Sequence, residues 1–217
     1  SVDLGGNIQF ADDGPSVTAG EASTDGITLI TDDTEAAGGS DANAYGAAAN
    51  DAGALVAALL SAASGTAAYG ADGQGAAATI GSFALNVDTQ ISGLTSGGDI
   101  IYLYDVSGDV VGSTTAPGDV TDAASITDNG VFTLSVSGAG VVSLTQEGAI
   151  DHLPNVDAAS YDELIALGDG VVSLSASVTV TDGDNDTAST PVSVDLGGNI
   201  QFADDGPSVT AGEASTD

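Results

Sequence analysis

The chain has 217 residues, of which 32 are Asp or Glu, one is His and none is Lys or Arg, so its formal net charge is −32. A chain without Lys or Arg cannot replace the counterions of nucleic acid or attract an anionic membrane, which excludes both as direct partners. The absence of cysteine excludes disulfides, thiolate catalysis and zinc–thiolate sites. No run of about 18 apolar residues and no basic, apolar leader occurs, so we expect no membrane insertion, and any export signal must lie outside these residues.

Hydrophobic residues make up 42% of the chain, and many of them are Val, Ile and Leu in short alternating runs. This content predicts a folded protein in spite of the charge. Repulsion among the carboxylates opposes compaction, so the folded state should need bound cations or high ionic strength. Calcium is the cation expected, since it prefers clustered carboxylate and carbonyl oxygens.

Strand-like runs with period-two alternation recur along the whole chain. They cover residues 26–31, 76–87, 100–105, 110–115, 131–137, 141–145, 171–181 and 187–195, and a short tail strand follows at 199–203. Turn-forming residues at 106–109 and 138–140 indicate two hairpin connections. The pattern predicts a mainly β fold, an immunoglobulin-like antiparallel β-sandwich with one or two short helices in an insertion.

Two segments depart from the alternation. In residues 51–63, four apolar side chains (Leu55, Val56, Leu59 and Leu60) fall on one helical face after a possible Asp51 cap. The second has Ser160 and Glu163 at capping-box spacing, followed by apolar residues up to Gly168. We expect both to be short helices that pack over the ends of the sandwich, with residues 32–53 and 61–78 forming loops or an insertion.

The first 25 residues recur without change as residues 193–217, which gives a period of 192 residues. A chain that repeats its own beginning is typical of a tandem array of nearly identical units, and a duplicated cloning artefact is the alternative. We therefore expect residues 1–14 to be the end of a preceding repeat and its linker. Residues 15–203 would be one complete repeat, and residues 204–217 the linker and start of the next.

The sharpest local motif is the acidic turn at residues 181–186, which contains Asp182, Asp184 and Asp186. Alternate residues of such a turn direct oxygen atoms toward one centre, as in the first half of an EF-hand loop. No Glu follows at the twelfth position, and strands flank the motif. Calcium ligation is the expected role, and a solvated polar hairpin is the alternative.

The second acidic cluster is Asp12 and Asp13, repeated as Asp204 and Asp205, each pair before Gly and Pro. In an immunoglobulin-like sandwich, the loop between the last two strands lies at the N-terminal end of the domain. The acidic turn should therefore lie beside the linker that carries Asp12 and Asp13, and a shared cation would fix the angle between repeats. Asp204 and Asp205 would do the same for the next repeat, unless the acids form only a solvated turn before a stiff Pro.

The amino-acid sequences of three segments resemble the type I secretion target repeats of giant repeats-in-toxin (RTX) bacterial adhesins. They are VFTLSVSGAGVVSLTQEGAIDH from Val131, VSLSASVTVTDGDNDTAS from Val172, and SVDLGGNIQFADDGP from Ser193. The resemblance covers roughly residues 100–207, whereas residues 26–80 match less clearly. It implies an extracellular, calcium-rigidified extender domain with an uncleaved C-terminal secretion signal elsewhere in the protein. It assigns metal binding to Asp12, Asp13, Asp182, Asp184 and Asp186, and it implies no catalytic residue.

The sequence as a whole predicts a structural repeat and not an enzyme. Its partners would be neighbouring identical repeats of the same chain on the bacterial cell surface, with Ca²⁺ as the cofactor and no small-molecule substrate. A carbohydrate- or cell-surface-binding module that acts by avidity is the alternative. A hydrolase would need a cleft with perturbed carboxylates, and His152, the only imidazole, has no evident catalytic partner.

Overall fold

The computed structural model describes residues 11–20, 22, 28–32, 47–49, 52–152 and 164–203. The elements in chain order are β1 (Leu29–Asp32), β2 (Ala47–Ala49), α1 (Ala52–Ser64), β3 (Gln74–Val87), β4 (Ile91–Ser96), β5 (Asp99–Val106), β6 (Asp109–Ser113), η2 (Pro117–Asp119), α2 (Ala123–Thr127), β7 (Gly130–Val136), β8 (Val142–Gln146), β9 (Leu164–Ala166), β10 (Val172–Asp182), β11 (Thr187–Asp195), η3 (Gly197–Asn199) and β12 (Ile200–Ala203). None of the described helices is long and apolar enough to cross a membrane.

The largest sheet has the strand order β2-β8-β7-β6-β5-β4, in which every neighbouring pair is antiparallel. Its β5–β6 hairpin turns at Ser107 and Gly108, both with positive φ, and the β7–β8 hairpin turns at Gly140, also with positive φ. These are the two hairpins that the turn-forming residues predict. The predicted mainly β, antiparallel fold with two helices is thus confirmed.

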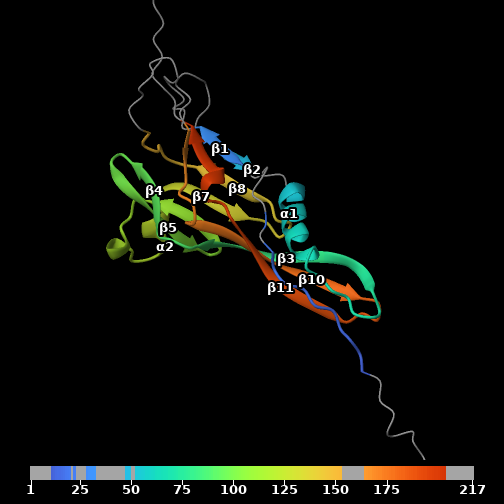
Figure 1. Cartoon of the computed structure of the whole chain (residues 1–217). Helices are drawn as coiled ribbons and strands as arrows, with labels where there is room; N and C mark the ends of the chain where they lie inside the picture. Colours follow the sequence, from blue (N-terminus) through green and yellow to red (C-terminus); the bar gives the residue numbers. More distant parts are fainter. Residues whose placement is uncertain are drawn as a thin grey trace, which may run out of the picture.

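A second antiparallel sheet, β11-β10-β3, packs on the large sheet through β3 (Figure 1). The helix α1 lies against all three strands of this second sheet and buries Leu55, Leu59 and Ala63. The helix predicted at residues 51–63 is therefore confirmed, and its apolar stripe faces the core as an amphipathic pattern requires.

The third sheet corrects one prediction. Its order is β1-β12-β9, with β1 parallel to β12 and β9 antiparallel to it. Residues 164–166, predicted to be helical, form β9, in which Ile165 pairs with Phe202. The partner strand offers these residues backbone hydrogen bonds that a local helical preference cannot match. Ser160 and Glu163, the predicted capping box, lie outside the described residues.

The main core joins the three sheets and α1. The face of β10 that begins at Val172 is buried at every second residue, and fully buried leucines from β5, β7 and β8 belong to the same core cluster. Phe132 on β7 and Phe202 on β12 are both fully buried, and their ring centroids lie 5.1 Å apart. Packing of this kind explains why a chain with so many carboxylates can still bury a core.

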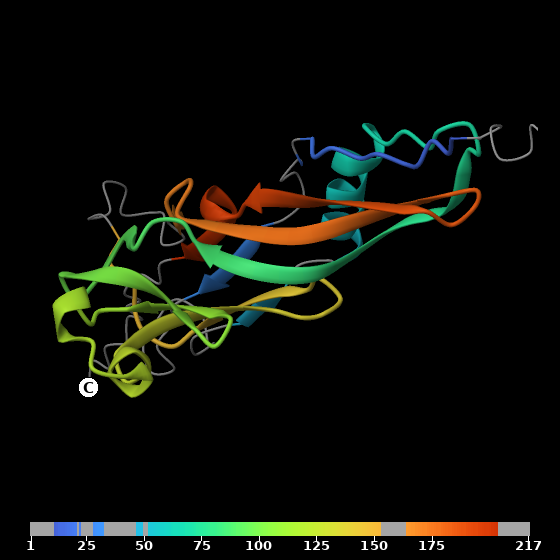
Figure 2. The ribbon, with the colours of Figure 1, turned by 90° about the horizontal axis from the view of Figure 1, so that it is seen from below.

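Residues 11–20 form an extended segment beside the end of α1 and the loop that follows it (Figure 2). This segment, which we call the strap, runs from the tip of the β10–β11 hairpin to the side of α1, whereas β12 lies toward the opposite end of the molecule (Figure 1). The beginning of the strap and β12 are thus at opposite ends of the described part of the chain.

Candidate metal centre

Asp182 is the last residue of β10 and occupies the face of the strand that is otherwise apolar and buried. The residues before it on this face are Val172, Leu174, Ala176, Val178 and Val180. Its side chain is 0% exposed, and its Oδ2 atom has no hydrogen-bond partner among the described residues. Because a buried carboxylate oxygen without a partner is costly, this atom calls for a positive group that the chain itself does not supply.

The turn after β10 directs two more carboxylates to the same end of the strand. The backbone N–H of Asp186 donates to Asp182 Oδ1 at 2.8 Å, and the N–H of Asp182 donates to the carbonyl of Asp186 at 3.1 Å. Asn185 adopts a positive φ of 78°, which Asn tolerates better than most residues. This geometry closes the hairpin and leaves the side chains of Asp184 and Asp186 exposed at its tip.

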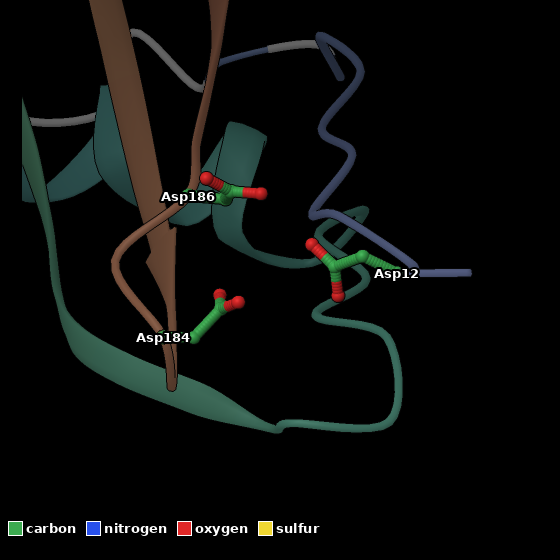
Figure 3. A group of neighbouring side chains, drawn as sticks. All are labelled: Asp12, Asp184 and Asp186. Carbon is green, nitrogen blue, oxygen red and sulfur yellow. The ribbon is translucent and has the colours of Figure 1, made fainter. Parts of the chain in front are cut away.

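Asp12 comes from the strap and meets these two side chains (Figure 3). One carboxylate oxygen from each of Asp12, Asp184 and Asp186 lies within 4.8 Å of the others. The sequence predicted that the acidic turn and the linker acids would lie side by side, although Asp12 and Asp184 are far apart along the chain. The structure brings Asp12 to the turn, and Asp13 is exposed outside this group.

Two glycines allow the surrounding backbone to approach closely. A Cβ atom on Gly75 would lie 1.8 Å from the carbonyl oxygen of Asp182, and a Cβ on Gly183 would lie 2.4 Å from that of Asp72. Only glycine fits either position without a shift of the backbone. The consequence is that the loop before β3, with Asp72, packs directly against the acidic turn.

Asp72 is the residue that sequence reasoning missed. Its carboxylate contributes to raising the pKa of Asp186, so it belongs to the electrostatic environment of the cluster. The only available signal was its place four residues before the strand predicted at residues 76–87, in a turn rich in Gly and Asp. That the same strand, β3, pairs with β10 and brings this turn to the acidic hairpin is a tertiary fact.

The carboxylates repel one another strongly. Burial raises the pKa of Asp182 above its usual range, and the neighbouring carboxylates of Asp184 and Asp186 raise it further. The side chain of Asp12 is the main cause of a raised pKa at Asp186, followed by the charge of Asp184. Two carboxylates can share a hydrogen bond only if one is protonated, so at neutral pH this arrangement is unfavourable until a cation or a proton neutralises it.

The donor set fits a hard divalent cation. Every side chain in the cluster offers oxygen, and neither imidazole nor thiolate contributes, which is the ligand preference of Ca²⁺ and Mg²⁺ and not of zinc or copper. Three carboxylates, each able to give one or two oxygens, together with nearby carbonyls could supply the six to eight oxygens that Ca²⁺ takes. Mg²⁺ keeps several waters and seldom uses such an all-protein cage. The partnerless Oδ2 of Asp182 supports the fit.

The last two predicted metal ligands, Asp204 and Asp205, are outside the described residues. His152 has Nδ1 at 2.9 Å from the carbonyl oxygen of Ile150 and Nε2 at 3.1 Å from that of Phe202. These backbone contacts give the imidazole a structural role in joining β12 to the segment after β8.

No significant similarity was found between this chain and curated proteins or solved structures. One family model, described as "Domain of unknown function (DUF5801)", matches residues 28–197. The matched region contains Asp72 and the acidic turn at residues 182–186, and it ends before β12. It does not include the strap, so the Asp12 carboxylate comes from outside the matched segment. The chain belongs to the DUF5801 family.

Proposed function

We propose that the chain is a calcium-stiffened structural repeat of a large secreted bacterial surface protein, an adhesin that uses many such units to hold a distal ligand-binding domain away from the cell for surface attachment or biofilm formation. The observation that carries this proposal is the mixed origin of the acidic cluster. Asp12 comes from the strap, whereas Asp184 and Asp186 come from the body of the unit. A cation held between them would join what precedes the unit to the unit itself.

The linker between proposed repeats would be very short. β12 ends at Ala203, and the residue equivalent to Ala203 one period earlier is Ala11. Asp12, a member of the acidic cluster, follows Ala11 directly. A bound cation would therefore act within one residue of the last strand of the preceding repeat, which leaves almost no flexible linker.

The position of the two ends supports an extended array. The strap begins at the tip of the β10–β11 hairpin, and β12 lies toward the opposite end of the molecule (Figure 1). Identical units joined through such ends gain length with every copy, as in other repeat proteins. Nothing in this arrangement requires a catalytic site, and we propose that the unit is not an enzyme.

Calcium binding also fits the export from the cell that the proposal implies. At low calcium inside the cell, repulsion within the cluster would disfavour the folded unit. At the millimolar calcium found outside, weak sites of the extracellular type are filled. The same ion would then couple folding to export.

The test is thermal unfolding of the chain in calcium and in a chelator. At a calcium concentration 100 times the Kd, one site stabilises the folded state by about 2.7 kcal/mol. For a domain of this size, that corresponds to a rise in Tm of about 5–10 °C. Sodium at matched ionic strength is the control, because screening alone should give a much smaller rise. A Tm that does not respond to calcium would remove the basis of the proposal.

A further inference from the structure

The strap binds its site mainly through backbone groups. Ser16 and Ala68 form an antiparallel bridge in which each N–H donates to the other residue's carbonyl at 2.8 Å. The N–H of Gly20 donates to the carbonyl of Ala62 at 3.2 Å, and the hydroxyl of Thr66 donates to the carbonyl of Thr18. We call the face made by Ala62, Thr66, Ala68 and Gly70 the strap site.

The fit between strap and strap site is close. A Cβ on Gly20 would lie 2.6 Å from the carbonyl oxygen of Ala62, and a Cβ on Gly70 would lie 1.9 Å from that of Asp13. Val17 also packs against the main core, so the strap covers apolar surface as well as pairing its backbone. At its N-terminal end the strap brings Asp12 to Asp184 and Asp186. These contacts describe a specific binding site for one extended peptide.

The chain contains two copies of this peptide. Residues 203–217 are identical to residues 11–25, whereas the strap site in residues 62–72 and the acidic turn in residues 182–186 each occur once in the sequence. One chain can therefore fill its own site with the first copy and still carry a second copy that has the same recognition groups.

We propose that the second copy, residues 203–217, binds the strap site of another copy of this chain. The second copy has the same residues for this pairing as the first. Ser208 corresponds to Ser16, Gly212 to Gly20 and Asp204 to Asp12. In a tandem protein that other copy is the next repeat, and in this respect the inference deepens the proposed function and rests on it. Between separate molecules the contact is head-to-tail and does not close on itself, so it generates open chains.

The joint then has two parts with different requirements. The pairing of the strap with its site uses backbone hydrogen bonds and the packing of Val17, neither of which needs a cation. The acidic cluster adds repulsion without calcium and attraction with it. The strap should therefore stay docked when calcium is removed, although less tightly.

The experiment compares four full-length chains: the wild type, S16P/G20V, S208P/G212V and the quadruple variant. Proline removes the N–H that pairs with Ala68, and valine at a Gly20 or Gly212 position meets the carbonyl of Ala62. S16P/G20V disables only the first copy, so its strap site is open to the second copy of another molecule. S208P/G212V is the matched control, since it carries the same two substitutions in the other copy.

Sedimentation velocity over a concentration series gives the readout. Only S16P/G20V should show a weight-average sedimentation coefficient that rises with concentration, and an excess of a synthetic peptide of residues 203–217 should return it to the monomer value. The other three chains should stay monomeric. Equal association of S16P/G20V and the quadruple variant would overturn the proposal, as would a monomeric S16P/G20V with a wild-type circular dichroism spectrum.

The same peptide keeps the experiment decisive if S16P/G20V does not fold. If this variant unfolds, the peptide must restore its circular dichroism spectrum, and failure to do so would also overturn the proposal. Repeating the series in chelator separates this proposal from the proposed function. Two results together would reject the calcium-stiffened joint and retain the binding of the strap. S16P/G20V would still associate in chelator, and calcium would leave the Tm of the wild type unchanged.

Discussion

Asp182 continues the buried face of β10 at a position where the five preceding members of that face are Val, Leu or Ala. One of its carboxylate oxygens accepts the N–H of Asp186, and the other has no partner. A buried acid of this kind is a source of instability in the absence of a counter-charge and a source of affinity when a cation is present. If calcium binds as proposed, the contribution of the acidic hairpin to stability should change sign with calcium.

Asp184→Asn tests this change of sign. The substitution keeps the shape of an exposed side chain and removes one negative charge from the cluster. In calcium it should remove half or more of the calcium-induced rise in Tm, because a ligand is weakened. In chelator the Tm should be equal to or higher than that of the wild type, because repulsion is relieved.

The control for this variant is Asp128→Asn, which changes an exposed acid at the end of α2, outside the cluster. It should shift the Tm equally with and without calcium. If Asp184→Asn lowered the Tm by the same amount in calcium and in chelator, the hairpin would be a structural turn and not a cation site.

The raised pKa values of Asp182 and Asp186 predict how the cation-free protein depends on pH. Because both groups bind a proton more tightly in the folded than in the unfolded state, their stabilising contribution is fully present below the ordinary value of 3.8. It is lost as the pH rises through the raised folded pKa. With calcium the direction reverses, since protons compete with the ion for the same oxygens.

Urea unfolding of the wild type and of Asp186→Asn in chelator, between about pH 4 and 8, measures this dependence. The free energy of unfolding of the wild type, minus that of the variant, should fall as the pH rises. Asp151 should not disturb the comparison, because the N–H groups of Gly98 and Gly97 lower its pKa and both proteins contain it. A pH-independent difference would mean that the carboxylates do not interact as the geometry requires.

Among the elements, the packing of β6 against Phe132 offers the sharpest test of the core. A Cβ on Gly112 would lie 2.3 Å from the Phe132 ring, which is fully buried against Phe202. Gly112→Ala should therefore lower the free energy of unfolding by about 1–3 kcal/mol, as overpacking does. Urea denaturation in saturating calcium measures it.

Gly81→Ala is the matched control for this substitution, since Gly81 is also a strand glycine and its Cβ would meet nothing within 4 Å. It should be neutral or slightly stabilising, because alanine restricts the unfolded chain. A loss of stability at Gly81 equal to that at Gly112 would show that the effect belongs to strand glycines in general and not to the ring of Phe132.

The long elements could be predicted from the sequence because their apolar periodicity agrees with their final environment. β10 and β11 alternate along their whole length, and α1 has a continuous apolar stripe. Prediction failed where pairing decided the outcome. β9 is a strand because β12 lies beside it, and β4 was missed because Ser92 and Gly93 interrupt its apolar pattern. The five-residue α2 depends on the capping box between Asp122 and Ser125 and is too short for periodicity to show.

The candidate site was predictable to the extent that its residues are adjacent in the sequence or follow from topology. The alternate spacing of the acids from Asp182 to Asp186 is visible in the sequence, and the predicted sandwich topology placed Asp12 beside them. Asp72 could not be found in this way, because it reaches the site only through the register of β3 with β10 and the close contact at Gly183. The lack of a hydrogen-bond partner for Asp182 Oδ2 among the described residues likewise could not be predicted, because it depends on the burial of the side chain.

At the scale of the whole molecule, the formal charge is −32 without any Lys or Arg, so every contact between repeats of the proposed array would have to overcome repulsion. Salt screens this repulsion mainly beyond a distance of about 8 Å at physiological ionic strength, so it acts weakly within the acidic cluster. A bound divalent ion acts where screening cannot. The joint between repeats is therefore the place where calcium should have its largest effect on shape.

Small-angle scattering of a chain with two complete repeats, in calcium and in chelator, tests that effect most directly. A rod in calcium, with a radius of gyration that changes to that of two flexibly linked bodies in chelator, is the predicted result. The same chain with Asp204→Asn at the junction should be flexible in both. Identical scattering in calcium and chelator, with each repeat folded, would contradict the claim that calcium stiffens the array.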